Sequence, residues 1–325
     1  MPDGTLHKPV LIEEFLRLAT PFSGSWVDCT YGDGGYSNAI SAAGADQVYA
    51  IDCDPDAVRR GRLRNGAAAI TLAQGRFGDF DRLPELREAR PFDGVIFDLG
   101  VSSMQFDQAE RGFSFRLDGP LDMRMQRQGK SAADIVNGAD EASLAEIFFR
   151  YGEEKSARRI ARAVVQSRRR AMIDTTGQLA NLVQDCLPRQ AERRIHPATR
   201  VFQALRIAVN DELVQLVKGL EAAERSLRTG GRLAVISFHS LEDRIVKRFL
   251  KGDAGSGNRH MPVRSETVRF DAITKRAVRP SPSEIAANPR SRSAKLRVAS
   301  RTLARAKPVD AGRVGLPRLA GPGIS

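Results

Sequence analysis

Cysteine and aromatic residues are scarce in this sequence, and long apolar runs are absent from it. The 325 residues include three cysteines, whose spacing matches neither a metal site nor a disulfide framework: Cys29, Cys53 and Cys186. No apolar run approaches the length that crosses a membrane, and residues 1–4 lack the layout of a secretory signal. We therefore expect a cytoplasmic protein with no metal site and no contact with a membrane.

Acidic residues are few in the last quarter of the chain, which gives the protein its basic character. The net charge is +12, and from Arg244 onward 19 Lys and Arg residues face only 5 Asp and Glu residues. The remainder of the chain is therefore close to neutral. A basic tail on a near-neutral body favours a polyanionic partner such as nucleic acid, with a solvated, partly disordered tail as the alternative. Aromatic residues make up only 6% of the chain, so no stacking platform for single strands is evident.

The stretch Trp26–Ser37 contains a glycine-rich turn between a strand pattern and a helix pattern. Three glycines, Gly32, Gly34 and Gly35, fall within four residues. This order is typical of the nucleotide-binding turn of a doubly wound α/β sheet. Ser37 replaces the third glycine of the dinucleotide fingerprint, so a merely tight turn remains an alternative.

Acidic residues around this turn favour a cationic ligand. Asp28 and Asp33 would repel a pyrophosphate, which needs positive potential at a helix start. They suit a ligand with an ammonium and a sulfonium group, which is S-adenosylmethionine. Asp52 ends the next strand 20 residues after Gly32, the spacing at which a carboxylate binds ribose hydroxyls. Its alternative role, capping the following helix, can be taken by Asp54.

Another acid, Asp98, ends the buried strand pattern at residues 95–97. Ligands of open α/β sheets bind outside the carboxyl ends of the strands, so Asp98 is a candidate for the chemistry. A helix or turn cap is the alternative. Phe77 follows the strand that begins at Ile70, where its ring could cover an adenine or pack in the core.

Residues 108–200 carry helical patterns and little strand signal. Helices are expected around 142–150, 154–171 and 176–186, and we interpret the block as a helical domain inserted between sheet strands. On the second of these helices three arginines share one face, which is either an RNA-facing stripe or an ordinary solvated face: Arg158, Arg162 and Arg169.

The α/β pattern resumes at Thr199. A single amphipathic helix is expected to reach Leu220 and to end by Gly230-Gly231. Residues 233–238 form the next strand, and His239 stands at its tip, on the same side of the sheet as Asp98. A lone histidine is usually structural, but this one lies in a candidate cleft.

Two later segments give weaker signals. Residues 252–294 are rich in Gly, Pro, Ser and Arg and are expected to form a mobile loop. Residues 296–299 form a plausible last strand, and the chain after Lys307 is expected to be disordered.

Together these stretches resemble the bacterial 16S rRNA (cytosine-N4)-methyltransferase family, from the N-terminus to about Arg301. The matching motifs are His7–Leu11, Gly32–Ser37, Ala50–Pro55, Asp98–Ser103, Arg111–Met125, Tyr151–Glu154, His196–Asn210 and Ser237–Lys247. The resemblance implies a class I, Rossmann-like methyltransferase sheet with an inserted helical domain, and S-adenosylmethionine as cofactor. It implies 16S rRNA in the small ribosomal subunit as partner, with a cytidine of the decoding region as target, and leaves a homodimer open.

The resemblance also assigns domains and cofactor contacts. Residues 1–107 and 201–306 would form the methyltransferase domain, 108–200 an inserted substrate-recognition domain, and 307–325 a disordered basic tail. The cofactor contacts would be Gly34, Gly35, Tyr36, Asp52, Phe77, Asp98 and Gln105. Tyr36 stands where the family commonly has histidine, so its backbone rather than its side chain is expected to serve. Met104 stands where proline is common.

The expected reaction requires a nucleophilic amine. Cytosine N4 is a poor nucleophile because its lone pair is delocalised into the ring, so an acceptor for the N4 hydrogen would help. Asp98, or the carbonyl of Leu99, is placed for that task. Asn210 and His239 are the candidates for contacting the edge of an unstacked base.

Three other functions compete with this interpretation. Methylation at cytosine C5 needs a cysteine nucleophile, and no cysteine lies between Cys53 and Cys186. A non-catalytic ribosome-binding factor could retain the fold, although Asp52 and Asp98 argue against a decayed site. An NAD-dependent oxidoreductase is disfavoured by Asp28 and Ser37.

Overall fold

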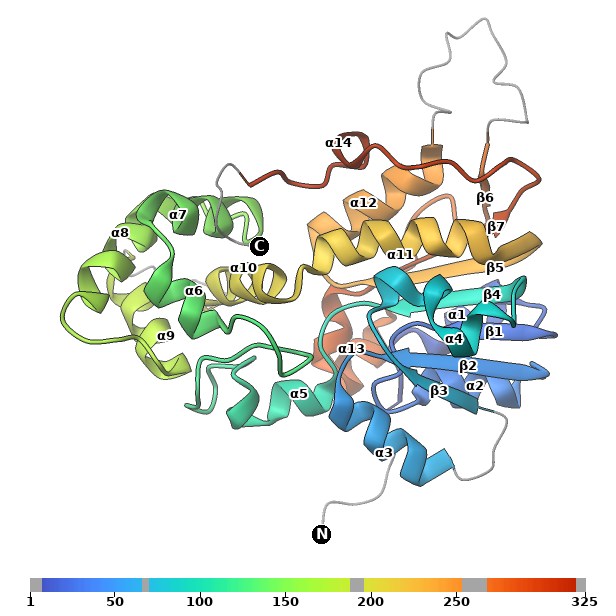
Figure 1. Ribbon diagram of the computed structural model, residues 1–325, viewed down its shortest axis with the longest axis horizontal. Helices are drawn as coiled ribbons and strands as arrows, with labels where there is room; N and C mark the ends of the chain where they lie inside the picture. Colours follow the sequence, from blue (N-terminus) through green and yellow to red (C-terminus); the bar gives the residue numbers. More distant parts are fainter. Residues whose placement is uncertain (1–7, 66–69, 188–195, 253–267, 320–325) are drawn as a thin grey trace, which may run out of the picture. The chain divides into compact units, whose positions relative to one another are not determined.

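The computed structural model describes residues 8–65, 70–187, 196–252 and 268–319, and its chain divides into two compact units (Figure 1). Unit 1 comprises residues 1–100 and 213–316, and unit 2 comprises residues 101–212 and 317–325. These boundaries differ from the predicted ones, which fall after residues 107 and 200. The helix from Thr199 to Asn210, assigned from residue 201 to the methyltransferase domain, belongs to unit 2.

Unit 1 is built on a seven-stranded sheet in the order β3-β2-β1-β4-β5-β7-β6. The strands are β1 Ser25–Asp28, β2 Gln47–Asp52, β3 Ile70–Gln74, β4 Phe92–Asp98, β5 Leu227–Ser237, β6 Phe270–Ala272 and β7 Lys295–Arg301. Strands β1 to β5 are parallel, whereas β7 runs antiparallel to both β5 and β6. The chain order reverses between β1 and β4, where a doubly wound sheet binds its ligands. The predicted doubly wound α/β fold is confirmed.

Helices cover the sheet of unit 1 because alternate strand residues are apolar on each face. On one face Trp26, Ile96 and Leu296 join a fully buried cluster with Phe15. On the other face Phe97 packs against aromatic rings of η1. The helical elements of this unit are α1 Ile12–Ala19, α2 Gly35–Ala42, α3 Pro55–Asn65, η1 Phe77–Arg82, α4 Pro84–Arg87, α11 Glu212–Ser226, α12 Ser240–Lys251, α13 Pro282–Ala287, η5 Pro289–Ser293 and α14 Ala311–Val314.

Unit 2 is helical, as its sequence predicts. Its elements are α5 Ser103–Asp107, η2 Ala109–Arg111, α6 Ala132–Gly138, α7 Glu141–Arg150, α8 Ala157–Arg168, α9 Thr176–Asp185 and α10 Thr199–Asn210. A long ordered loop between η2 and α6 is pinned from two sides. The buried Arg111 side chain donates to the carbonyls of Arg124 and Met125 at 3.1 and 3.0 Å, and Asn210 Nδ2 donates to the carbonyl of Met123 at 2.8 Å.

Four predictions about the chain after Thr199 are wrong. The single helix expected from Thr199 to Leu220 is interrupted at Asp211, whose φ of 54° lies in the left-handed region, so it forms α10 and α11. The second helix ends at Ser226, and Gly230-Gly231 lie inside β5, which pairs with β4 from Leu227.

The remaining two errors concern expected disorder. The expected loop at 252–294 contains β6, α13 and η5; its residues 253–267 lie outside the described part of the chain. The tail after Lys307 packs on unit 1 up to residue 316, and its residues 320–325 lie outside the described part of the chain. Val309 N donates to Glu221 Oε1 at 2.6 Å, and Val314 is buried. Among the described helices none is both long and apolar enough to span a membrane.

Candidate active site

The glycine turn after β1 is shaped by contacts that only glycine permits. Gly34, the N-terminal cap of α2, has a φ of 80°, and a Cβ there would lie 2.8 Å from the Tyr31 hydroxyl oxygen. A Cβ on Gly35 would lie 2.4 Å from Cγ of Pro9. The turn is therefore tight for reasons internal to the protein, and the first N–H groups of α2 that follow it have no acceptor within the helix.

The two acids that flank the turn are engaged with protein groups. Asp28 is fully buried, and its carboxylate accepts hydrogen bonds from Ser37 Oγ at 2.7 Å and Thr30 N at 3.1 Å. Asp33 Oδ1 lies 4.0 Å from a guanidinium nitrogen of Arg60 and 3.8 Å from one of Arg64. Asp28 therefore has a structural role, because it ties β1 to α2. Asp33 pairs with α3, but its Oδ1 is buried without a hydrogen bond, so its contact with a cationic ligand stays a prediction.

Asp52 connects the end of β2 to the glycine turn. Its Oδ2 accepts a hydrogen bond from Gly32 N and its Oδ1 accepts one from Asp54 N, both at 2.8 Å. Burial raises the Asp52 pKa to about 6, although these two backbone donors oppose the rise. Each oxygen retains capacity for a second donor, so the geometry leaves room for ribose hydroxyls. Asp54 accepts from Asp56 N at 2.9 Å and takes the capping role expected of it.

Asp98 ends β4 with one acceptor atom that no described residue satisfies. Its backbone N–H donates to Thr30 Oγ1 at 2.7 Å, which fixes the strand end. Its Oδ1 is buried and accepts no hydrogen bond. Burial raises the pKa of Asp98 well above its usual value, and the nearby carboxylates of Asp28 and Glu242 raise it further. A buried carboxylate oxygen without a donor is costly, so this position fits a ligand that brings a donor or a positive charge.

Two aromatic residues of the predicted cofactor set have different surroundings. Phe77 begins η1 and packs edge-on against Phe97, with the ring centroids 5.7 Å apart, while its ring stays partly exposed. The Tyr36 side chain instead lies in the core, where its hydroxyl donates to the Val10 carbonyl and its ring packs against Phe15. Burial raises the Tyr36 pKa well above its usual value. Only the backbone of Tyr36 is available to a ligand, as its departure from the family pattern suggests.

Gln105 and Asn210 belong to unit 2, and both side chains are already hydrogen-bonded there. Gln105 completes a capping box with Ser102 at the start of α5. Both amide hydrogens of Asn210 are used, by the carbonyls of Met123 and Arg206, and its Oδ1 accepts from Met125 N at 2.9 Å. Asn210 therefore holds the loop at residues 123–125 and has little capacity left for a base edge.

His239 lies in unit 1 at the tip of β5, where it caps α12. Its Nδ1 accepts from Glu242 N at 3.4 Å, and Glu242 Oε2 accepts from His239 N at 3.2 Å and from Phe238 N at 2.8 Å. Nε2 lies 3.1 Å from Glu242 Oε1 without the alignment of a hydrogen bond. His239 therefore has a structural role as the cap of α12, and its contact with a base stays a prediction.

Sequence reasoning missed three residues that shape the site. Thr30 positions Asp98 across 68 residues of sequence, and Ser37 positions Asp28 across nine, each through one hydrogen bond that no local pattern marks. Glu242 could have been found, because a cap residue followed three positions later by glutamate is the capping-box spacing.

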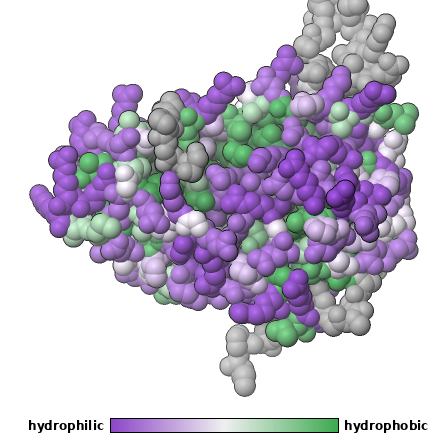
Figure 2. Space-filling model, viewed as in Figure 1, coloured by the Kyte–Doolittle hydropathy of each residue, from purple (hydrophilic) through white to green (hydrophobic). Residues whose placement is uncertain are grey.

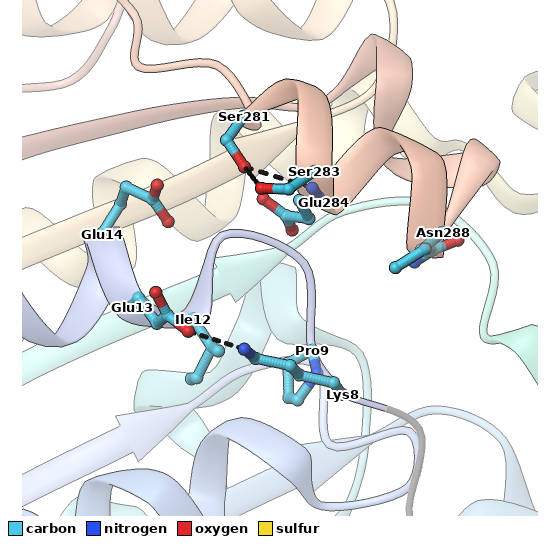
Figure 3. Close-up of a pocket in the computed structure, with 10 residues that line it drawn as sticks. Lys8, Pro9, Ile12, Glu13, Glu14, Ser281, Ser283, Glu284 and Asn288 are labelled. Atoms are coloured by element: carbon cyan, nitrogen blue, oxygen red, sulfur yellow. Dashed lines mark hydrogen bonds and ion pairs between the residues drawn. The ribbon is translucent and has the colours of Figure 1, made fainter.

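A pocket of about 420 Å³ lies elsewhere in unit 1, between the segments that carry α1 and α13 (Figure 3). Its wall includes Lys8, which pairs with Glu13 at 2.6 Å, and Glu284, whose Oε1 accepts from Leu11 N at 2.7 Å. Pro9 lines it and also packs on Gly35. None of the predicted cofactor residues is among those that line this pocket.

In comparison with known proteins, a family model and several named relatives match nearly the whole chain. The model of the MraW methylase family matches residues 4–302. Ribosomal RNA small subunit methyltransferase H of Cereibacter sphaeroides (strain ATCC 17025 / ATH 2.4.3) is 53% identical over 96% of this chain and 95% of its own length. The protein of the same name from Methylobacterium sp. (strain 4-46) is 54% identical over 92% of each chain. An rRNA methylase structure from Streptococcus thermophilus aligns over 89% of this chain and 93% of its own, at 12% identity and a TM-score of 0.38.

Proposed function

This chain belongs to the MraW methylase family, and on that basis we propose that it transfers a methyl group from S-adenosylmethionine to the exocyclic N4 of a cytidine in the decoding region of small-subunit rRNA. Relatives that share about half of its residues are named small-subunit rRNA methyltransferases. The observation that carries the finer part of the proposal is Asp98, a buried strand-end carboxylate with one unsatisfied oxygen.

The residues of unit 1 fit the proposed cofactor. The start of α2 behind Gly34 offers backbone donors, Asp52 retains acceptor capacity for ribose hydroxyls, and the partly exposed ring of Phe77 can cover the adenine. Asp98 supplies a negative charge whose cost of burial a cationic ligand would offset. When bound, S-adenosylmethionine supplies a methyl group that its sulfonium already activates.

The protein then contributes alignment and an acceptor for the amine hydrogen. As N4 attacks, an acceptor on one of its hydrogens keeps electron density on nitrogen and opposes delocalisation into the ring. Asp98 Oδ1 is such an acceptor, and the short hydrogen bond from Asp98 N to Thr30 holds the residue in place. Asn210 and His239 act in this proposal as positioning residues, because their side chains hold a loop and cap a helix.

The cysteines argue against methylation at the ring carbon. That reaction needs a thiolate nucleophile, and reactive cysteines have lowered pKa values. Here burial raises the pKa of Cys29 and Cys53 well above the usual value and raises that of Cys186 as well. Asp28 and Asp52 next to the first two thiols raise their pKa values further.

The decisive experiment identifies the methylated atom. Small-subunit rRNA from cells that lack the protein is methylated by the purified enzyme, digested to nucleosides and compared by mass spectrometry with N4- and C5-methylcytidine standards. We expect N4-methylcytidine at one site. A C5-methyl product would overturn the mechanism, and a chain that binds S-adenosylmethionine in calorimetry but methylates no RNA would overturn the proposed substrate.

A further inference from the structure

The exposed side of α8, in unit 2, carries cations and no acidic residue. From residue 155 to residue 173 the sequence has seven Lys and Arg residues and no Asp or Glu. Four exposed arginines project within an arc of about 100° around the helix axis, and we call them the α8 arginine face: Arg158, Arg159, Arg162 and Arg169. The buried side of the helix is apolar and includes Ile160 and Val164. The part of unit 2 that is visible in Figure 2 is largely hydrophilic.

The arginines of this face have few anionic partners within the protein. Arg162 lies 3.5 Å from Glu141, and both side chains are well exposed, so the pair contributes little. Among the described residues no carboxylate lies within ion-pair distance of Arg158, Arg159 or Arg169. An ordinary solvated helix face mixes both signs of charge, and this one does not.

The arrangement also opposes the stability of α8. Arg158 and Arg159 stand in the first turn, where the helix dipole is positive, and that turn has no acidic residue. Cations there are unfavourable for the same reason that anions are favourable. Arg158 and Arg162 are also like charges four residues apart, which repel. The stability of α8 therefore gives no reason for these arginines, whereas a bound polyanion would offset both the dipole interaction and the repulsion between Arg158 and Arg162.

We propose that the α8 arginine face binds the sugar-phosphate backbone of the RNA substrate. Guanidinium groups bind phosphate oxygens in a bidentate geometry, and backbone contacts fix orientation without reading sequence. This inference rests on the proposed function, because it takes RNA as the substrate. It adds the surface by which unit 2 holds that RNA, separately from the strand-end acids of unit 1.

The test compares two double variants with equal changes in net charge. Arg158→Gln/Arg159→Gln removes two cations of the face. Arg87→Gln/Arg90→Gln removes two exposed arginines just before β4, near the amino end of that strand, whereas the strand-end acids lie at the carboxyl ends. Filter binding to transcribed 16S rRNA is measured over a range of KCl concentrations. We expect the α8 variant to bind about tenfold more weakly at low salt, with a log–log salt slope shallower by about 2. The Arg87/Arg90 variant should match the wild type.

Three further measurements separate the possible causes of a change. The α8 variant should have a thermal midpoint equal to that of the wild type or slightly higher, because it lacks the two unfavourable charge interactions. Its affinity for S-adenosylmethionine should be unchanged, and Arg158→Lys/Arg159→Lys should restore part of the RNA binding, because lysine keeps the charge but not the bidentate geometry. Equal RNA affinity in the wild type and the α8 variant would overturn the inference while leaving methyl transfer by the wild type intact. Unchanged binding to free rRNA but weaker binding to whole small subunits would overturn it in favour of an acidic protein surface.

Discussion

Three carboxyl groups at the ends of parallel strands differ in the donors that they already have. Asp28 and Asp52 each accept two hydrogen bonds, whereas Asp98 Oδ1 accepts none. Burial raises the pKa of each of them. Because hydrogen bonds to the ionised form oppose that rise, the residue with an unsatisfied oxygen is the one whose environment a bound cation would change most.

At the scale of single residues, the affinity for the methyl donor S-adenosylmethionine should depend on pH through Asp52. Its folded-state pKa of about 6 lies above the ordinary value, so protonation favours the folded state, and this contribution is lost as pH rises from about 4 to about 6. A protonated Asp52 is a weaker acceptor for ribose hydroxyls, so S-adenosylmethionine affinity should fall as pH falls through 6. Calorimetry between about pH 5 and pH 8 measures this.

Asp52→Ala serves as the control for that titration. It should weaken binding at neutral pH by about 1.5–3 kcal/mol, the range for hydrogen bonds to a charged group, and it should flatten the profile. A profile as steep in the variant as in the wild type would assign the titration to another group, and a wild-type affinity would remove Asp52 from the site.

Asp98→Asn tests the acceptor role without changing the size of the side chain. It replaces an acceptor oxygen by a donor nitrogen, so stabilisation that exists only in the transition state is lost and the chemical step slows. Single-turnover methyl transfer should fall much more than RNA affinity. Asp271→Asn removes an equal charge from an exposed position on β6 and should transfer methyl groups nearly normally. An unchanged single-turnover rate in Asp98→Asn would exclude Asp98 from the chemistry.

At the scale of elements, variants of His239 can separate its capping of α12 from a direct role of the imidazole in methyl transfer. His239→Ala removes the side-chain acceptor at the start of α12 and should cost about 0.5–2 kcal/mol of unfolding free energy. Asparagine is a good N-cap, so His239→Asn should keep most of that stability in a urea titration. We expect methyl transfer to follow stability across the two variants. Loss of transfer in a stable His239→Asn protein would show instead that the imidazole itself takes part.

The elements also show what could and could not be predicted from the sequence. Asp52 and Asp98 can be placed at strand ends from the sequence, because a short apolar run followed by an acid is a local pattern, and both end parallel strands of the sheet. The interruption at Asp211 and the extension of β5 through Gly230-Gly231 depend on tertiary contacts that override a helical period. Likewise, the amide of Asn210 is occupied by a loop 85 residues away in sequence, which no local pattern marks.

At the scale of the whole molecule, the basic last quarter of the chain is only partly available to a polyanion. Arg269 Nη1 lies 3.0 Å from Glu224 Oε2, and Arg297 Nε lies 2.8 Å from Asp243 Oδ1. The buried Arg301 donates to backbone carbonyls around the end of β7. These cations hold unit 1 together, so the excess positive charge of this region overstates its capacity to bind RNA. The exposed arginines of α8 are fewer, but among the described residues only Arg162 forms an ion pair within the protein.

Truncation after Lys307 tests whether the tail is structural, as its packing indicates, or a free basic arm. The deletion removes the hydrogen bond from Val309 N to Glu221 and exposes the site that buries Val314. Together these should cost about 2–4 kcal/mol of unfolding free energy in a urea titration. Truncation after Leu316 keeps both contacts and should match the full chain. S-adenosylmethionine affinity should be equal in all three proteins at a temperature where each is folded, because Gly34, Asp52 and Asp98 lie on other elements. Equal stability of the two truncated proteins would mean that the tail is not held by these contacts in solution, and the basic-arm interpretation would then apply to residues 308–316 as well.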